Sequence, residues 1–114
     1  MNQSMTLNIA KDFSREPAGR YVADGSASGE VFCDKHLIPA LKRAEVVTVV
    51  LDGTEGYGSS FLEEAFGGLV RRLGLAESEF SRRIKLISDD DPTLIEEILG
   101  YVREEVHRRR AHAG

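Results

Sequence analysis

Residues 52–60 read DGTEGYGSS and directly follow the apolar run VVTVVL. Glycines let a backbone approach a phosphate closely, and a serine hydroxyl can act as a nucleophile or carry a phosphate group. A loop of this composition could therefore bind an anion, present Ser59 or Ser60 for modification, or simply turn the chain. The three alternatives differ in the other residues that they require.

The sequence does not supply the residues that an enzyme would need beside this loop. A nucleotide-binding P-loop ends in Gly-Lys-Ser/Thr, whereas no lysine precedes these serines. A serine nucleophile needs a base, but His36 falls in a helical pattern, and His107 and His112 lie near the C-terminus. The single cysteine, Cys33, also falls in a helical pattern, and no pair of histidines or cysteines has a metal-ligand spacing. We therefore expect a non-enzymatic protein without a cofactor or a metal.

The composition is typical of an ordinary globular domain. Of the 114 residues, 41% are apolar and 30% are charged, which allows a core without disulfides. No apolar run approaches the roughly 20 residues that span a bilayer, and the N-terminus lacks a signal-peptide layout. We expect one cytoplasmic domain over residues 1–114, with its core at about 5–107 and a basic C-terminal tail at 108–114.

The net charge of −4 conceals an uneven distribution of charge. Residues 89–97 contain acids and no bases, whereas residues 103–112 are rich in arginine and histidine. Acids at the start of a helix and bases at its end complement the helix dipole. Because the whole chain is acidic, this pattern favours a solvated last helix, and we do not expect nucleic acid as a partner.

Strands and helices alternate along most of the chain. Periodicity predicts strands at 5–9, 20–23, 46–51 and 84–87, of which the first two would form a hairpin. It predicts helices over 28–41 and 60–73 and from Pro92 onward. The order β-β-α-β-α-β-α indicates an α/β domain, with helices packed on a mostly parallel or mixed sheet.

Four residues are expected to shape these helices. Ser60 and Glu63 have the spacing of a capping box, and Gly74 is expected to end the same helix in a left-handed conformation. Pro39 is expected to bend or split the helix before it. The loop at 52–60 would then lie at the carboxyl end of a central strand, where α/β domains commonly place their sites.

Four segments resemble the STAS-like domain family of unknown function (DUF4325), which is related to the STAS domains of anti-sigma factor antagonists. They are KDFS at 11–14, GR at 19–20, SGEVF at 28–32 and GYGSSFLEEAFGGL at 56–69, within a resemblance that covers most of residues 5–100. The resemblance implies a STAS-like fold and a regulatory signalling module that binds another protein.

In antagonists of this kind, a partner kinase of the histidine-kinase-like ATPase fold phosphorylates a serine at a helix start, and phosphorylation releases the partner. The resemblance makes Ser59 and Ser60 candidate phosphosites. It also suggests a partner or ligand surface, which comprises Gly53, Gly56, Tyr57, Gly58, Phe61, Glu64 and Arg20.

The sequence departs from the antagonist pattern in two respects. Antagonists usually have Asp-Ser/Thr-Ser/Thr-Gly directly after the strand, whereas six residues separate Asp52 from Ser59 here, and Phe61 replaces the glycine. The longer loop leaves an alternative function open. In that alternative the protein is a small-molecule or nucleotide sensor, and the loop at 53–60 holds an anionic ligand.

Overall fold

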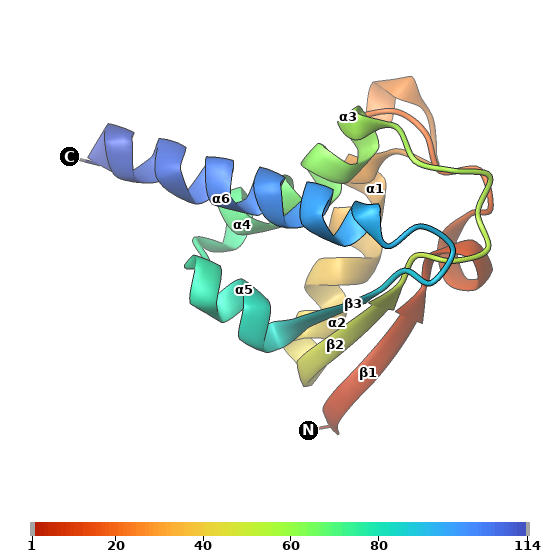
Figure 1. Ribbon diagram of the computed structural model, residues 1–114, viewed down its shortest axis with the longest axis horizontal. Coiled ribbons are helices and arrows are strands. Elements are labelled where there is room, and N and C mark those ends of the chain that lie inside the picture. The colour runs from red at the N-terminus through yellow and green to blue at the C-terminus, as the bar shows by residue number, and fades with distance from the viewer. Residues whose placement is uncertain (1, 114) are drawn as a thin grey trace.

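Three parallel strands form the sheet of this protein. The computed structural model describes residues 2–113 and contains β1 (Asn2–Asn8), β2 (Ala44–Val50) and β3 (Ile84–Ile87). The strands are hydrogen-bonded in the order β1-β2-β3, and Figure 1 shows their carboxyl ends at one edge of the molecule. Parallel strands require crossover connections, and helices supply both of them. The expected α/β fold class is therefore confirmed.

Two long helices connect the strands, and each contains a wide π-helical turn. The first consists of α1 (Gly29–Phe32), a wide turn at Cys33–Leu37 and α2 (Ile38–Arg43). The second consists of α3 (Ser59–Leu62), a wide turn at Glu63–Gly67 and α4 (Gly68–Leu73). Two further helices follow, α5 (Glu77–Arg83) and α6 (Thr93–Ala113).

The α-helical bonding pattern of the first long helix is interrupted just before Pro39, as expected near that residue, and the helix continues beyond it. The N–H of Ile38 donates to the carbonyl of Cys33, so the wide turn ends immediately before the α-helical bonding pattern resumes. Proline has no N–H and its ring crowds the preceding turn, and a locally wider turn accommodates both properties.

The predicted strand at 20–23 is wrong, and with it the N-terminal hairpin. The backbone N–H groups of Arg20 and Tyr21 both donate to the carboxylate of Asp24, at 3.1 and 2.8 Å. These local bonds occupy amides that a strand would use, and Val22–Asp24 forms a 3₁₀ turn instead. Helix α5 was not predicted.

The predicted capping box at Ser60 and Glu63 is also wrong. The helix begins one residue earlier, at Ser59. Its N-cap is Gly58, which has no side chain to cap the first backbone N–H groups of the helix. The Glu63 carboxylate does not return to the helix start because it forms an ion pair with Arg20. In contrast, Ser28 caps α1 by accepting from the N–H of Val31, and Gly74 ends α4 with φ 65°. The prediction for Gly74 is confirmed.

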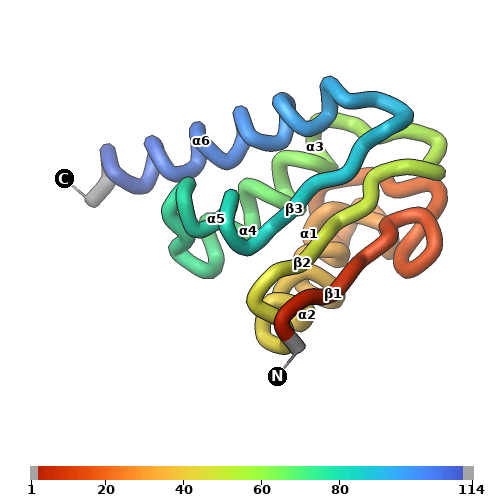
Figure 2. The backbone as a smooth tube through the Cα atoms, turned by 60° about the horizontal axis from the view of Figure 1, so that its bottom comes forward, coloured from red at the N-terminus to blue at the C-terminus, as the bar shows by residue number. Residues whose placement is uncertain are grey.

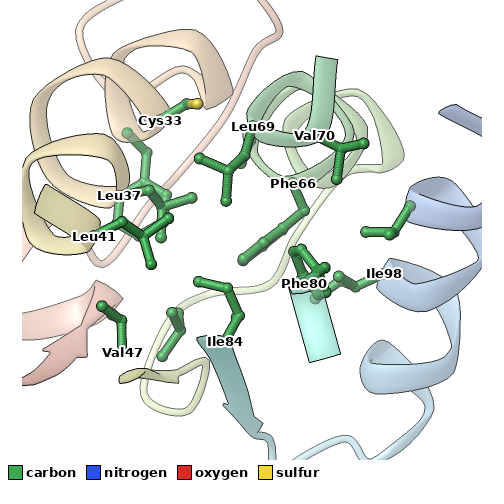
Figure 3. Close-up of a cluster of buried hydrophobic side chains, with 14 of the residues drawn as sticks. Cys33, Leu37, Leu41, Val47, Phe66, Leu69, Val70, Phe80, Ile84 and Ile98 are labelled. Atoms are coloured by element: carbon green, nitrogen blue, oxygen red, sulfur yellow. The ribbon is translucent and has the colours of Figure 1, made fainter. Parts of the chain in front are cut away.

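The helices cover one face of the sheet, as Figure 2 shows. On that face Val47 and Val49 of β2 are fully buried, whereas Val46, Thr48 and Val50 on the other face are only half-buried. The run of apolar, mostly β-branched residues at 46–51 is typical of a strand buried on both faces, but β2 is fully buried on one face only. Figure 3 shows the core between the sheet and the helices, built from Cys33, Leu37, Leu41, Val47, Phe66, Leu69, Val70, Phe80, Ile84 and Ile98.

The two long helices touch at Gly29. A Cβ atom at this position would lie 2.4 Å from the carbonyl oxygen of Phe61 and 3.0 Å from the backbone nitrogen of Ala65. Only a glycine permits this approach, which brings α1 against α3. Ser28 and Gly29 therefore have structural roles. The serine caps α1, and the glycine allows the second long helix to pack closely against it.

Candidate functional site

The candidate site lies where the carboxyl ends of the three strands meet. The loop after β2 leads to α3, and in Figure 1 it runs along this edge of the molecule next to the turn that follows β1. Asp52 lies two residues after the end of β2, and Asp89 and Asp90 lie two and three residues after the end of β3. Sheet geometry thus gathers polar residues that are far apart in the sequence.

Asp52 and Asp90 join the loops that follow β2 and β3. The Asp52 carboxylate accepts hydrogen bonds from the backbone N–H groups of Asp89 and Asp90, at 3.1 and 2.8 Å. In return, the N–H of Gly53 donates to the carboxylate of Asp90 at 3.2 Å. We refer to this reciprocal arrangement as the aspartate latch. Sequence reasoning missed the latch, although an aspartate shortly after each of two strands was a signal for it.

Most amides at the start of the loop already have partners inside the protein. The N–H of Gly53 is held by the aspartate latch, that of Glu55 donates to the carbonyl of Arg15 at 2.8 Å, and that of Gly56 donates to Oγ1 of Thr54 at 3.2 Å. These bonds fix the loop, and Gly53 and Gly56 adopt positive φ angles of 91° and 131° to make them. The amides at 53, 55 and 56 are therefore not free to cradle an anion.

Tyr57 ties the middle of the loop to the end of the strand. Its hydroxyl donates to the carbonyl of Leu51 at 2.7 Å, and burial raises the pKa of Tyr57 to about 12. Its ring also packs 5.7 Å from that of Phe61. Tyr57 is thus half-buried, and its main contacts are structural.

Of the two candidate phosphosites, Ser59 is the more accessible. Ser59 is exposed and is the first residue of its helix, whereas Ser60 is half-buried. Gly58, also exposed, precedes them. Because the N-cap is a glycine, no side chain from that position occupies the first amides of the helix.

Phe61 and Glu64 do not belong to an exposed surface. Phe61 has an exposed fraction of 0% and packs against Phe13 and Phe32, and Glu64 has an exposed fraction of 4%. The expectation that these two side chains form part of a partner face is not met. The helix turns them inward, because their spacing places them on the same side as the core residues.

Glu64 belongs to a chain of ion pairs between the second long helix and α6. Its carboxylate lies 3.0 Å from Nη2 of Arg71, whose Nη1 lies 2.7 Å from the carboxylate of Glu105. Burial disfavours the charge on Arg71, but the carboxylates of Glu64 and Glu105 outweigh this effect and raise its pKa. Arg108 also pairs with Glu105, at 2.9 Å. This chain of ion pairs is therefore a structural feature.

Arg20 reaches the start of the second long helix and pairs with Glu63. This hydrogen bond raises the pKa of Arg20. The two neighbouring residues, Tyr21 and Val22, are 53% and 58% exposed, and the Arg20 guanidinium lies 6.0 Å from the centre of the Tyr21 ring. Exposed aromatic and apolar side chains beside an arginine are typical of contact surfaces, but the sequence prediction of a strand here concealed this feature.

His36 and Cys33 have structural surroundings. His36 packs against the rings of Phe13 and Phe32, with centroid distances of 5.2 and 5.8 Å. Cys33 is fully buried, and burial raises the pKa of its thiol to about 11. Among residues 2–113, no three acidic, histidine or cysteine side chains come together in a way that could hold a metal ion.

The fold and the loop define a class of protein: a small α/β domain with a serine at a helix start that follows the central strand. The chain belongs to the STAS-like domain family of unknown function (DUF4325), whose family model matches residues 28–94. This finding confirms the resemblance noted from the sequence. Searches of curated proteins and of solved structures give no significant match. Within residues 2–113, every helix is too short or too polar to cross a membrane.

Proposed function

We propose that this chain is a non-enzymatic regulatory module that binds another protein through the start of the second long helix. The observation that carries the proposal is the position of Ser59, which is exposed and begins a helix whose N-cap glycine makes no side-chain bond. A phosphate on Ser59 would meet the positive end of the helix dipole. Ser59 is therefore the phosphosite that we favour over the half-buried Ser60.

Phosphorylation of Ser59 would act on Arg20 through Glu63, the ion-pair partner of that arginine. Ser59 and Glu63 are four residues apart in one helix, so their side chains are neighbours on its surface. A phosphate of about −1.5 to −2 charges would compete with Glu63 for the Arg20 guanidinium. Because Tyr21 and Val22 follow Arg20 directly, a shift of that arginine would change the exposed apolar surface beside the helix start.

The proposed contact surface consists of the loop at 54–60 and the adjacent residues 20–22. Tyr21 and Arg20 are of the types that dominate binding energy in protein interfaces. The partner that the family resemblance suggests is an ATPase of the histidine-kinase-like fold, which would also be the kinase. The alternative, an anionic ligand cradled by the loop, has less support because the amides of Gly53, Glu55 and Gly56 are already bonded within the protein.

The first test is the modification itself. The protein is purified from its own host, and its intact mass is measured, with fragmentation across residues 52–72. The expected result is a fraction of the molecules with one added phosphate on Ser59. A phosphate on another residue, with Ser59 unmodified under every growth condition, would contradict the switch.

The second test measures binding. Immobilised wild-type protein, Ser59→Ala and Ser59→Asp are compared for retention of a protein from host extract, and the Kd of the purified partner is then determined. Ser59→Asp is expected to weaken binding at least about tenfold, and Ser59→Ala to leave it unchanged. Ser78→Asp is the matched control, since Ser78 is also an exposed serine in the first turn of a helix, α5. Equal Kd values for wild-type protein and Ser59→Asp would contradict the proposal.

A further inference from the structure

An open cavity of about 500 Å³ lies at the carboxyl ends of the strands, on the β1 side of the loop. Its lining contains residues that follow each of the three strands, including Ala10 and Lys11 after β1, Gly53 after β2 and Asp90 after β3. Its size is within the range of small-molecule sites, and its position is the one that open α/β sheets commonly use. None of the lining residues belongs to the proposed contact surface at 54–60 and 20–22, and the two regions adjoin where the N–H of Glu55 donates to the carbonyl of Arg15.

The cavity lining contains two cations, Lys11 and Arg15, and two carboxylates, Asp52 and Asp90. Within residues 2–113, neither cationic side chain has a hydrogen-bond or ion-pair partner. Several other arginines pair with carboxylates, including Arg20, Arg71, Arg72 and Arg103, whereas Arg43 and Arg110 resemble Arg15 in forming no such pair within residues 2–113. Two unpaired cations in one concave site are suited to a doubly charged anion such as a phosphate monoester.

The backbone that carries these cations is held in place. Lys11 belongs to the wide turn at Ile9–Phe13, where its N–H donates to Oδ1 of Asn8 at 3.1 Å and the N–H of Ser14 closes the turn on the carbonyl of Ile9. The carbonyl of Arg15 accepts from the N–H of Glu55. The site is thus preorganised at the backbone, which reduces the cost of ordering on binding.

Gly53 keeps the cavity open. A Cβ atom at this position would lie 3.3 Å from the Cβ of Ala10, which also lines the cavity. The aspartate latch fixes this glycine from the other side, because the Gly53 N–H donates to Asp90. Each latch carboxylate still has lone pairs available, so Asp52 and Asp90 could accept hydrogen bonds from hydroxyl groups of a ligand.

We propose that this cavity binds a phosphate monoester of a small polyhydroxylated compound, such as a sugar phosphate or a nucleoside monophosphate. Lys11 and Arg15 hold the phosphate, and Asp52 and Asp90 accept hydrogen bonds from hydroxyl groups. The four charges of the lining sum to zero, so an isolated phosphate gains less than an ester whose hydroxyl groups also satisfy the two acids. This inference does not rest on the proposed protein-binding function, because the side chains involved are different.

The experiment is a titration of ¹⁵N-labelled protein, followed by two-dimensional NMR. The probes are ribose 5-phosphate, glucose 6-phosphate and AMP. Inorganic phosphate and ribose serve as controls that carry only the phosphate or only the hydroxyl groups. At least one ester is expected to shift the amide signals of Lys11, Arg15 and Gly53 saturably below about 10 mM, at least about tenfold more tightly than inorganic phosphate.

Paired variants assign the effect to the two cations. Lys11→Ala/Arg15→Ala is expected to weaken ester binding at least about tenfold. Lys35→Ala/Arg110→Ala removes the same charge from exposed positions on other elements and is expected to leave binding unchanged. The proposal is overturned if no ester gives a saturable shift, if inorganic phosphate binds as tightly as the esters, or if binding survives in the first double variant.

Discussion

Cys33 shows how far its surroundings decide the chemistry of a single residue. The thiol is fully buried in the core, and this burial raises its pKa to about 11. The thiolate is the reactive form of cysteine, and here it is both inaccessible and scarce at neutral pH. The residue therefore behaves as a small apolar side chain.

We expect Cys33 to resist alkylation by iodoacetamide at about pH 8 in the native protein and to react fully in denaturant. Intact mass measurement over time gives both rates. Rapid labelling of the native protein would contradict the burial of this thiol. Iodoacetamide does not react with serine hydroxyls. The rate of Cys33 labelling can therefore be compared between the native wild-type protein and Ser59→Asp, and equal rates would show that the variant is folded like the wild type.

The same pKa shift has a consequence for stability. The pKa of Cys33 in the folded state is higher than its unfolded value of 9.0, so the folded state favours the protonated thiol. Its contribution to the unfolding free energy is complete below about pH 9 and is lost as the pH rises toward 11. The fall in the urea midpoint over this range should be smaller in Cys33→Ala than in the wild type.

At the scale of elements, the second long helix contains two adjacent glycines in different surroundings. A Cβ atom at Gly67 would have its nearest neighbour at 3.8 Å, which is an ordinary contact. A Cβ atom at Gly68 would lie 3.0 Å from the buried carboxylate of Glu64 and 3.5 Å from Nη2 of Arg71. Gly68 thus makes room for the ion pairs that join this helix to α6.

Gly67→Ala should therefore raise the unfolding free energy by up to about 1 kcal/mol, through helix propensity. Gly68→Ala should lower it by about 1 kcal/mol, because the added methyl group displaces a carboxylate that Arg71 holds. Urea denaturation of the two variants measures the difference. Equal stabilisation by the two substitutions would contradict this prediction. It would show that the Glu64–Arg71 ion pair can shift to accommodate a methyl group at position 68.

Elements with a continuous apolar run, a regular periodic pattern or a specific end signal were predictable. β2 and β3 have short apolar runs, Ser28 and Gly74 mark helix ends, and α6 has a regular apolar face. The strand predicted at 20–23 failed because one carboxylate, Asp24, redirects the backbone. Helix α5 buries only Phe80, so its apolar pattern was too weak to detect.

At the scale of the whole molecule, the position of the loop was predictable, but most of its partners were not. A strand followed by glycines and a helix places the loop at the carboxyl end of the sheet. The aspartate latch and the cavity depend on Asn8, Asp52 and Asp90, which only the strand order brings together. Likewise, the bond from Glu55 to Arg15 joins segments with no sequence signal for contact.

The strand order also determines how the chain must fold. Each pairing in the sheet joins distant residues, such as Met5 with Val47 and Val47 with Ile84, and no hairpin provides a local starting point. The chain loses the conformational entropy of closing these long loops before strand pairing stabilises the sheet. We therefore expect refolding to take milliseconds to seconds. Stopped-flow circular dichroism measures this rate. A microsecond phase that restores the full signal would contradict this expectation. During synthesis on a ribosome, β1 would leave the exit tunnel first. It would remain unpaired until the first long helix and β2 had also left the tunnel.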